Sequence, residues 1–329
     1  MIDVARLAEV SQQTVSRVVN GATNVSPEIR ERVELAIEQL RYKRNAAAAA
    51  LASSRTRTIG VVSFELNVVG PSVALYGISE EARRHGYATR LVTLGSLERE
   101  DVKAAMRTIG PDEVDGIIVL APLQDAVSML DDLTAGIPVV TFQQGSPASA
   151  TSVSIDEVSG ARAVVAHLLG LGHETVWHVQ GPPGWMASDA RRRGWAEALA
   201  EAGRPVPRPV ATSGWSPADG YRAGRVLAAR AEVTAVFAAN DHFALGVLKA
   251  FDEVGRAAPA EVSVVGFDNL QESAFFRPAL TTVTLDFEAV GEVAVTALLE
   301  RIRGGDAAII PLIPATLVVR ETTAAPARR

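Results

Sequence analysis

The chain has 329 residues, of which 48% are hydrophobic, so it is long enough for two or three domains with sizeable cores. It contains no cysteine, which excludes disulfides and thiolate metal sites. No apolar run approaches the ~18 residues of a membrane-spanning helix, and the N-terminus lacks the basic-then-apolar pattern of a secretory signal. We therefore expect a cytoplasmic protein that makes no contact with a membrane.

The formal net charge is −6, which is unusual for a protein that binds nucleic acid. The charge is unevenly distributed, however: nine basic and six acidic residues lie before Ile59, and 23 basic and 32 acidic residues follow. A modestly basic head on an acidic body confines attraction for nucleic acid to one end of the chain. Random scatter also produces so small an excess, so charge alone does not decide the function.

Residues 3–21 predict two short helices joined by a tight turn. The first helix runs from Asp3 to Glu9 and places Val4, Leu7 and Ala8 on one side. Ser11 is a good N-cap for the second helix. The second helix carries three valines at i, i+3 and i+4, which predicts a buried face. Its other face consists of Gln12, Gln13, Ser16, Arg17 and Asn20.

This polar face is suited to DNA. A helix fits the major groove, where Gln pairs with adenine and Arg bonds twice to guanine. Short hydroxyl and amide side chains bond to phosphate oxygens. The alternative is a helical hairpin with a solvated polar face. The residues that we expect to contact DNA in this stretch are Ser11, Gln12, Gln13, Thr14, Ser16, Arg17 and Asn20.

A third helix and an alanine-rich stretch complete the N-terminal region. Ser26 and Pro27 predict the start of the third helix, since Ser favours the N-cap and Pro the first helical position. Residues 45–54 hold five consecutive alanines, the best helix formers, but a helix of fewer than about 12 residues is marginal alone. This stretch is therefore a short conditional helix or a low-complexity linker.

From Thr58 onward, apolar strands alternate with helices. Strands that are apolar on both faces are typical of parallel sheets covered by helices. The alternation predicts an α/β fold with two doubly wound lobes and a cleft between them, as in periplasmic binding proteins. The predicted strands are Ile59–Phe64, Thr89–Leu94, Gly116–Ala121, Pro138–Phe142, Thr175–Val179, Ala235–Ala239 and Val262–Phe267. The predicted helices include Val73–His85, Gly160–Leu171, Ala190–Ala202, Tyr221–Arg230 and Phe243–Val254, with crossing segments at Thr282–Asp286 and Thr316–Thr322.

Several motifs resemble the LacI/GalR (lactose-repressor) family of bacterial transcription regulators. The string from Val10 to Asn20 is similar to the helix-turn-helix of this family, and the resemblance extends to about Thr323. Family members usually carry several more residues before Asp-Val-Ala, so either the start of the chain is misassigned or Asp3 caps a shortened first helix. In this family the alanine-rich stretch is a hinge helix that forms on operator DNA, and Leu51 matches the leucine that enters the minor groove.

The resemblance also predicts domains and an effector site. It divides the chain into a headpiece (1–44), a hinge (45–57) and an effector-binding core (58–329), with an N-lobe at about 58–155 and 287–314 and a C-lobe at about 156–286 and 315–323. The strings at 239–241, 263–268, 191–195 and 280–283 match ligand-pocket motifs of the family. Carried over by position, the effector-binding residues are Phe64, Val68, Pro71, Gln143, Arg191, Trp215, Asn240, Asp268 and Phe287.

These residues also suit a sugar by their chemistry. Carboxylate, amide and guanidinium groups bond to hydroxyl pairs, and an aromatic ring stacks on the C–H face of a sugar. Singly, Asp268 is as well explained as a helix cap, Arg191 as an ion-pair partner and Trp215 as surface packing. The chain departs from the lactose-type pocket at Phe64, Gln143 and Leu285, which replace Ser, Asp and Gln, so a different neutral saccharide is expected.

Enzyme motifs are missing from the sequence: there is no phosphate loop, no His-Glu-x-x-His and no G-x-G-x-x-G. We expect no catalytic residue, no metal and no cofactor. The sequence thus predicts a homodimeric transcriptional repressor that binds a pseudo-palindromic operator and is released by a sugar. A corepressor-type regulator of the same fold and a sugar-binding transport protein are the alternatives.

Overall fold

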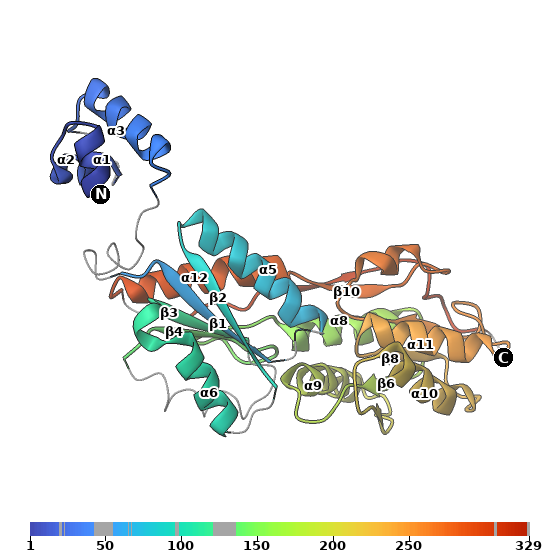
Figure 1. Ribbon diagram of the computed structural model, residues 1–329. Coiled ribbons are helices and arrows are strands. Elements are labelled where there is room, and N and C mark those ends of the chain that lie inside the picture. Colours follow the sequence, from blue (N-terminus) through green and yellow to red (C-terminus); the bar gives the residue numbers. More distant parts are fainter. Residues whose placement is uncertain are drawn as a thin grey trace. The chain divides into compact units, whose positions relative to one another are not determined.

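The computed structural model describes residues 1–19, 22, 24–42, 55–64, 66, 68–95, 99–120, 136–305 and 308–327. The chain divides into two compact units, Met1–Thr56 and Arg57–Arg329, which we call the headpiece and the core. Figure 1 shows both units, coloured along the sequence.

The described headpiece contains three helices, α1 (Ile2–Leu7), α2 (Gln12–Val19) and α3 (Pro27–Gln39). Ser11 accepts a hydrogen bond from the Thr14 amide at 3.1 Å, so it caps α2 as predicted. The helices close around a small apolar cluster, which explains the spacing of apolar residues in the sequence. The buried members are Val4, Ala5, Ala8, Val15, Val18, Val33 and Ala36.

Two details of the first helix were predicted incorrectly. Leu7 does not share the buried face of Val4 and Ala8, because its side chain is 47% exposed. Asp3 lies within the first turn of α1 and does not cap it, since the N-cap is Met1 and makes no side-chain bond. The C-terminal end of α1 is instead held by Arg32 of α3, which donates to the carbonyl of Glu9 at 3.2 Å.

The first sheet of the core, in the N-lobe, has five parallel strands in the order β2-β1-β3-β4-β5. Alternating residues of β1 pack on opposite faces: Ile59 and Val61 contact the side of α5 and α12, and Val62 contacts the side of α6. The elements are β1 (Thr58–Phe64), α5 (Val69–Arg84), β2 (Ala88–Leu94), α6 (Arg99–Ile109), η1 (Pro111–Glu113), β3 (Gly116–Leu120), β4 (Val139–Phe142) and β5 (Ser152–Val153).

The second sheet, in the C-lobe, has four parallel strands in the order β7-β6-β8-β9, so it repeats the winding of the first. Helices α8 and α9 cover the face that carries Phe237, and α10 and α11 cover the face that carries Val236. The elements are α8 (Glu157–Gly170), β6 (Trp177–Gln180), α9 (Met186–Glu201), β7 (Val210–Ala211), α10 (Pro217–Ala228), β8 (Ala235–Ala238), α11 (Asp241–Asp252), β9 (Ser263–Val265) and η2 (Gln271–Phe275).

After the second sheet the chain returns to the first. Strands β10 (Thr282–Leu285) and β11 (Ala315–Val318) pair antiparallel within the two predicted crossing segments. Between them, α12 (Phe287–Ile302) packs against α5 and the first sheet, so the first lobe is built from distant parts of the sequence. The α/β architecture of two doubly wound parallel sheets is therefore confirmed, although the sequence analysis named neither α6 nor α12.

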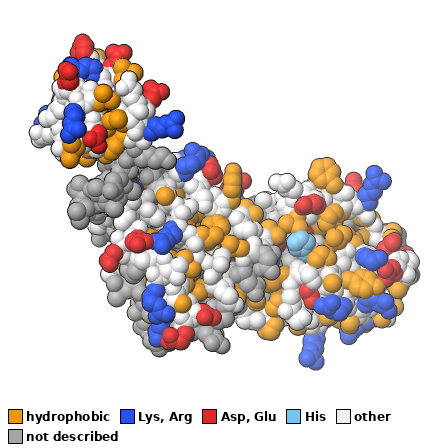
Figure 2. Space-filling view, in the orientation of Figure 1, with side chains coloured by type: hydrophobic (Ala, Val, Ile, Leu, Met, Phe, Trp, Pro, Cys, Tyr) orange, Lys and Arg blue, Asp and Glu red, His pale blue; other side chains and the backbone are white. Residues whose placement is uncertain are grey.

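Among the described residues, no helix is both long and apolar enough to cross a membrane, and no three His, Asp or Glu side chains are grouped to hold a metal ion. Figure 2 shows acidic and basic side chains interspersed over the visible surface of the core.

The packing of α5 on α12 yields a stability prediction. An ideal Cβ on Gly291 would lie 2.2 Å from the backbone carbon of Gly77, so the two helices touch through their glycines. Gly291→Ala must push the helices apart, and we expect it to lower the free energy of unfolding by at least about 1–3 kcal/mol, as overpacked interiors do. Denaturant unfolding measures this loss.

Gly170→Ala is the matched control. Gly170 ends α8, and a Cβ there meets nothing within 4 Å. Because alanine favours the helix, the control should be neutral or gain up to about 1 kcal/mol. Equal stability of Gly291→Ala and the wild type would contradict the close approach of α5 and α12.

Candidate DNA-reading helix and effector cleft

Helix α2 presents the polar face that the sequence predicts. Val15 and Val18 are buried in the headpiece, and the side chains of Gln12, Gln13 and Arg17 are exposed. The two glutamines lie in the first turn of the helix, and Arg17 lies one turn further on. The exposed face thus carries the three side chains best suited to bond base edges.

The remaining predicted DNA contacts differ from these three. Ser11 and Thr14 are bonded to each other, with their side-chain oxygens 2.9 Å apart, so the Ser11 oxygen already serves as the cap of α2. Ser16 is half-buried. Asn20 and Leu51 lie outside the described residues, as does the whole alanine-rich stretch from Asn45 to Ser54.

A cleft of about 470 Å³ opens in the core. It lies at the carboxyl ends of the parallel strands β6, β8 and β9, where ligands bind in doubly wound sheets. The start of α5 completes it from the N-lobe. The lining residues are Val68, Val69, Pro182, Trp185, Ser213, Gly214, Trp215, Ser216, Pro217, Asp219, Asn240, His242 and Asp268.

Arg191 of α9 lies behind this lining, with only 3% of its side chain exposed. Its Nε pairs with the carboxylate of Glu157, its Nη1 donates to the carbonyl of Ala239, and its Nη2 lies 3.1 Å from Asp268 Oδ1. The guanidinium also lies 4.2 Å from the ring centre of Phe267. Arg191 therefore supports the wall of the cleft and orients Asp268, which faces the cleft.

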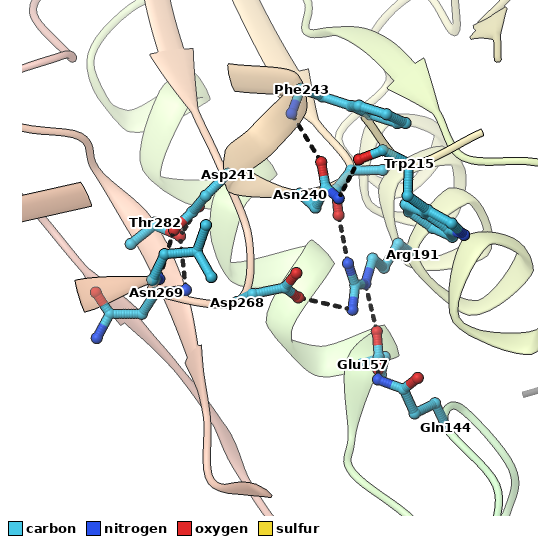
Figure 3. A network of polar contacts seen from close by, with 12 residues as sticks. Gln144, Glu157, Arg191, Trp215, Asn240, Asp241, Phe243, Asp268, Asn269 and Thr282 are labelled. Carbon is cyan, nitrogen blue, oxygen red and sulfur yellow. Dashed lines mark hydrogen bonds and ion pairs between the residues drawn. The ribbon is translucent and has the colours of Figure 1, made fainter. Parts of the chain in front are cut away.

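Figure 3 shows that the polar network continues away from the cleft. Glu157 is fully buried at the start of α8 and accepts a hydrogen bond from Gln144 Nε2 at 3.0 Å. Gln144 follows β4 of the first sheet, and Asp268 follows β9 of the second. The chain of contacts Gln144–Glu157–Arg191–Asp268 thus joins the two lobes.

Asp268 has an unusual electrostatic environment. Burial raises the pKa of its carboxyl to about 7; Arg191 opposes this rise, and the carboxylates of Asp241 and Glu157 add to it. Its backbone has a φ of 102°, a left-handed conformation that an L-residue adopts only when its surroundings enforce it. The carboxyl can therefore both accept and donate hydrogen bonds near neutral pH.

Asn240 and Asp241 are neighbours in the chain but have different roles beside the cleft. Asn240 caps α11 by accepting from the Phe243 amide at 2.8 Å, and its Nδ2 lies 3.3 Å from the carbonyl of Trp215. Asp241 is buried and accepts a hydrogen bond from Ser273 Oγ at 2.6 Å. Asn240 lines the cleft and is held in place by these hydrogen bonds. Asp241 does not line the cleft but stabilises the fold.

Two tryptophans form the aromatic part of the lining. The ring of Trp215 stacks on Phe243 with centroids 5.6 Å apart and an interplanar angle of 13°, and Trp185 meets it edge-on at 5.6 Å. A Cβ on Gly181 would come within 2.2 Å of the Trp215 ring, so this glycine makes room for the indole. The indoles give the cleft apolar surface of the kind that packs on the C–H face of a sugar.

Besides Arg191, four predicted effector contacts lie outside the cleft lining. Phe287 is buried and packs edge-on against Phe142, with centroids 6.3 Å apart. Gln143 folds back, because its Nε2 donates to Thr141 at 2.9 Å. Pro71 is buried within α5, and Phe64 is half-buried beside the cluster under α6. The structure thus gathers Trp215, Asn240 and Asp268 at the cleft, supported by Arg191, and leaves Phe64, Pro71, Gln143 and Phe287 beside it.

Several residues of the site were not predicted from the sequence. Glu157 directly follows Asp156, the N-cap of α8, so it resembles an ordinary acid in a first helical turn. Gln144 carries no sequence signal of its own. Trp185 was detectable, since it lies in the Gly181–Ser188 loop that follows a predicted strand and precedes Arg191.

Comparison with known proteins places this geometry in a family. Residues 1–45 match the family model described as bacterial regulatory proteins, lacI family, and residues 165–323 match a periplasmic binding protein-like domain. The lactose operon repressor of Escherichia coli (strain K12) is 34% identical over 334 residues, covering 99% of this chain and 91% of that protein. The chain belongs to the lacI family.

Other relatives and a solved structure support the same family. The repressor PurR of Haemophilus influenzae (strain ATCC 51907 / DSM 11121 / KW20 / Rd) is 30% identical over 92% of this chain and 91% of that protein. The crystal structure of a lac repressor dimer bound to operator and the anti-inducer ONPF has a TM-score of 0.88 and 33% identity, covering 98% of both chains. This lacI-family member is therefore a DNA-binding transcriptional repressor.

The buried Asp268 of this lacI-family chain makes its stability depend on pH. The folded pKa of about 7 exceeds the ordinary value of 3.8, so the folded state binds the proton more tightly. The free energy of unfolding that Asp268 contributes should fall as pH rises from about 4 to about 7 and stay level outside that window. Melting temperatures of the wild type and Asp268→Asn across pH 3.5–8.5 test this.

The expected result is a difference between the two proteins that changes only inside the window. The control is Asp252→Asn, at an exposed aspartate that ends α11. A difference that does not vary with pH would contradict the raised pKa of Asp268.

Proposed function

We propose that the chain represses a carbohydrate-utilisation operon and is released from DNA by a small neutral saccharide. One observation carries the proposal: the same chain has an exposed Gln12, Gln13 and Arg17 face and a cleft that combines tryptophan rings with Asn240 and Asp268. The first suits base edges in the major groove. The second suits a ligand with hydroxyl groups on an apolar ring.

On DNA, two copies of the chain act as a homodimer in the cytoplasm. Two headpieces read the half-sites of a pseudo-palindromic operator, whose two-fold symmetry matches that of the dimer. Residues 45–57 act as the hinge, and Leu51 opens the minor groove as an apolar wedge. Residues 58–329 form the effector-binding core.

Release requires two states of the core with different affinity for the saccharide. The saccharide then lowers operator affinity by the same factor by which operator DNA lowers saccharide affinity. A corepressor of the same fold differs only in sign, because its ligand raises operator affinity. A transport protein binds sugar alone and has no operator. Operator binding with and without sugar separates these three functions.

The DNA-reading proposal predicts the effect of Arg17→Ala. Loss of one bidentate base contact weakens operator binding by about 1–3 kcal/mol and relaxes the preference at one base pair of each half-site. Selection of binding sites from a random pool, followed by titration of the selected DNA, measures both effects.

The matched control is Arg6→Ala, which removes an exposed charge of the same headpiece from α1. It should weaken binding to all sequences alike or not at all. An unchanged base preference in Arg17→Ala would exclude base readout by Arg17.

The effector proposal predicts the effect of Asp268→Asn. The amide keeps the shape of the carboxylate but replaces one acceptor oxygen with a donor, so sugar hydroxyls are mispaired. Loss of a hydrogen bond to a charged group should weaken saccharide binding by about 1.5–3 kcal/mol, or about 10- to 100-fold in affinity. The variant should bind the operator normally and fail to respond to the sugar in a reporter assay; a normal response would refute the assignment.

A further inference from the structure

We propose that Glu157 makes the cleft selective against anionic ligands: it occupies Arg191, so that the cleft accepts an uncharged saccharide and rejects sugar acids and sugar phosphates. The proposal rests on the saccharide function above and assigns a specificity role to a residue that does not line the cleft.

The guanidinium of Arg191 is the one that pairs with the cleft residue Asp268, and its contacts lie within the chain itself. Each of the three nitrogens of Arg191 is directed at an acceptor of the chain itself, on Glu157, Ala239 or Asp268. One face of the guanidinium is covered by the ring of Phe267. These contacts use three of the five N–H groups of Arg191, and its side chain is only 3% exposed, so a ligand anion has little access to the fork by which arginine usually binds carboxylate or phosphate.

The charges around Arg191 do not balance. Arg191 faces two carboxylates, Glu157 and Asp268, and a third, Asp241, lies close enough to raise the pKa of Asp268. The buried imidazole of His178 adds no positive charge, because burial lowers its pKa to about 3. A buried positive charge shared by more than one carboxylate leaves a net negative floor.

The described lining supplies no cation to reverse this balance. It contains no lysine or arginine, and its titratable side chains are Asp219, His242 and Asp268. Asp219 accepts from Ser216 Oγ at 2.6 Å in the cap of α10 and pairs with Arg222, so its charge is compensated. The negative charge that an anionic ligand would meet therefore comes from the side of Asp268.

Glu157 is the residue that makes the net charge beneath the cleft negative. Without its charge, Arg191 and Asp268 form a neutral pair that no longer repels an anionic ligand. Glu157→Gln keeps the size of the side chain and an oxygen for Arg191. Gln144 can rotate its amide to present an oxygen to the new NH₂ group, so no buried polar group loses its partner. Glu157→Asn is a second neutral variant of smaller size.

The experiment compares matched ligands by calorimetry: neutral hexoses, the corresponding uronic acids and the hexose 6-phosphates. For any hexose that binds, the wild type should prefer it at least tenfold over its acidic counterparts. Glu157→Gln should reduce that preference at least tenfold, chiefly by gaining affinity for the acids. Glu201→Gln is the control, since Glu201 is exposed, pairs with Arg162 and makes the same change in net charge.

Two measurements need no sugar. Inorganic phosphate should raise the melting temperature of Glu157→Gln but not that of the wild type or of Glu201→Gln. A ¹³C NMR titration of the Asp268 carboxyl, assigned with Asp268→Asn, should show a lower pKa in Glu157→Gln and in Glu157→Asn. If no saccharide binds the wild type, the proposed effector is wrong, while these two measurements still test the role of Glu157.

The proposal is overturned if the wild type binds uronic acids or sugar phosphates as tightly as neutral hexoses. It is equally overturned if the neutral variants gain no affinity for anions and leave the pKa of Asp268 unchanged. Should Glu157→Gln fail to fold, Glu157→Asn and the ligand preference of the wild type test the same role of Glu157.

Discussion

The buried charge of Arg191 is the constraint on which the core depends. A guanidinium that is 3% exposed must be matched by acceptors, because an uncompensated buried charge destabilises a protein strongly. The acceptors come from three places: Glu157 at the start of α8, Ala239 after β8 and Asp268 after β9. The hydrogen bonds and ion pairs of one arginine therefore hold three segments together, and these segments form the wall of the cleft.

Topology supplies the rest of the cleft. Parallel strands place all their carboxyl ends at one edge of a sheet, so residues far apart in the sequence, such as Pro182, Asn240 and Asp268, meet without any local signal. The same winding occurs in both sheets. The two edges contribute unequally, however: the C-lobe provides most of the polar and aromatic lining, and the N-lobe provides Val68 and Val69 at the start of α5.

Sequence reasoning predicted what depends on local pattern. All strands of both sheets except the two-residue β5 and β7, the cap at Ser11 and the polar face of α2 follow from residue spacing, and the structure contains them. It failed where tertiary packing decides. Leu7 obeys the helical period, but α1 has only six residues and buries a narrower face. Helix α12 carries a cap at Asp286 and apolar residues at helical spacing, and was missed because Asp286 was assigned to the end of a crossing segment and Phe287 to the effector site.

The site shows the same division. Asn240 and Asp268 follow predicted strands, and Trp215 matches the family by position, so all three were identifiable. Glu157 and Gln144 were not, because their role depends on contacts between the lobes. This has a physical consequence for any ligand of the cleft. Arg191 pairs with Asp268 at the cleft and with Glu157, which in turn accepts a hydrogen bond from Gln144 of the first lobe. A ligand that bonds Asp268 would share that carboxylate with Arg191, so the cleft and the contact between the lobes meet at one side chain.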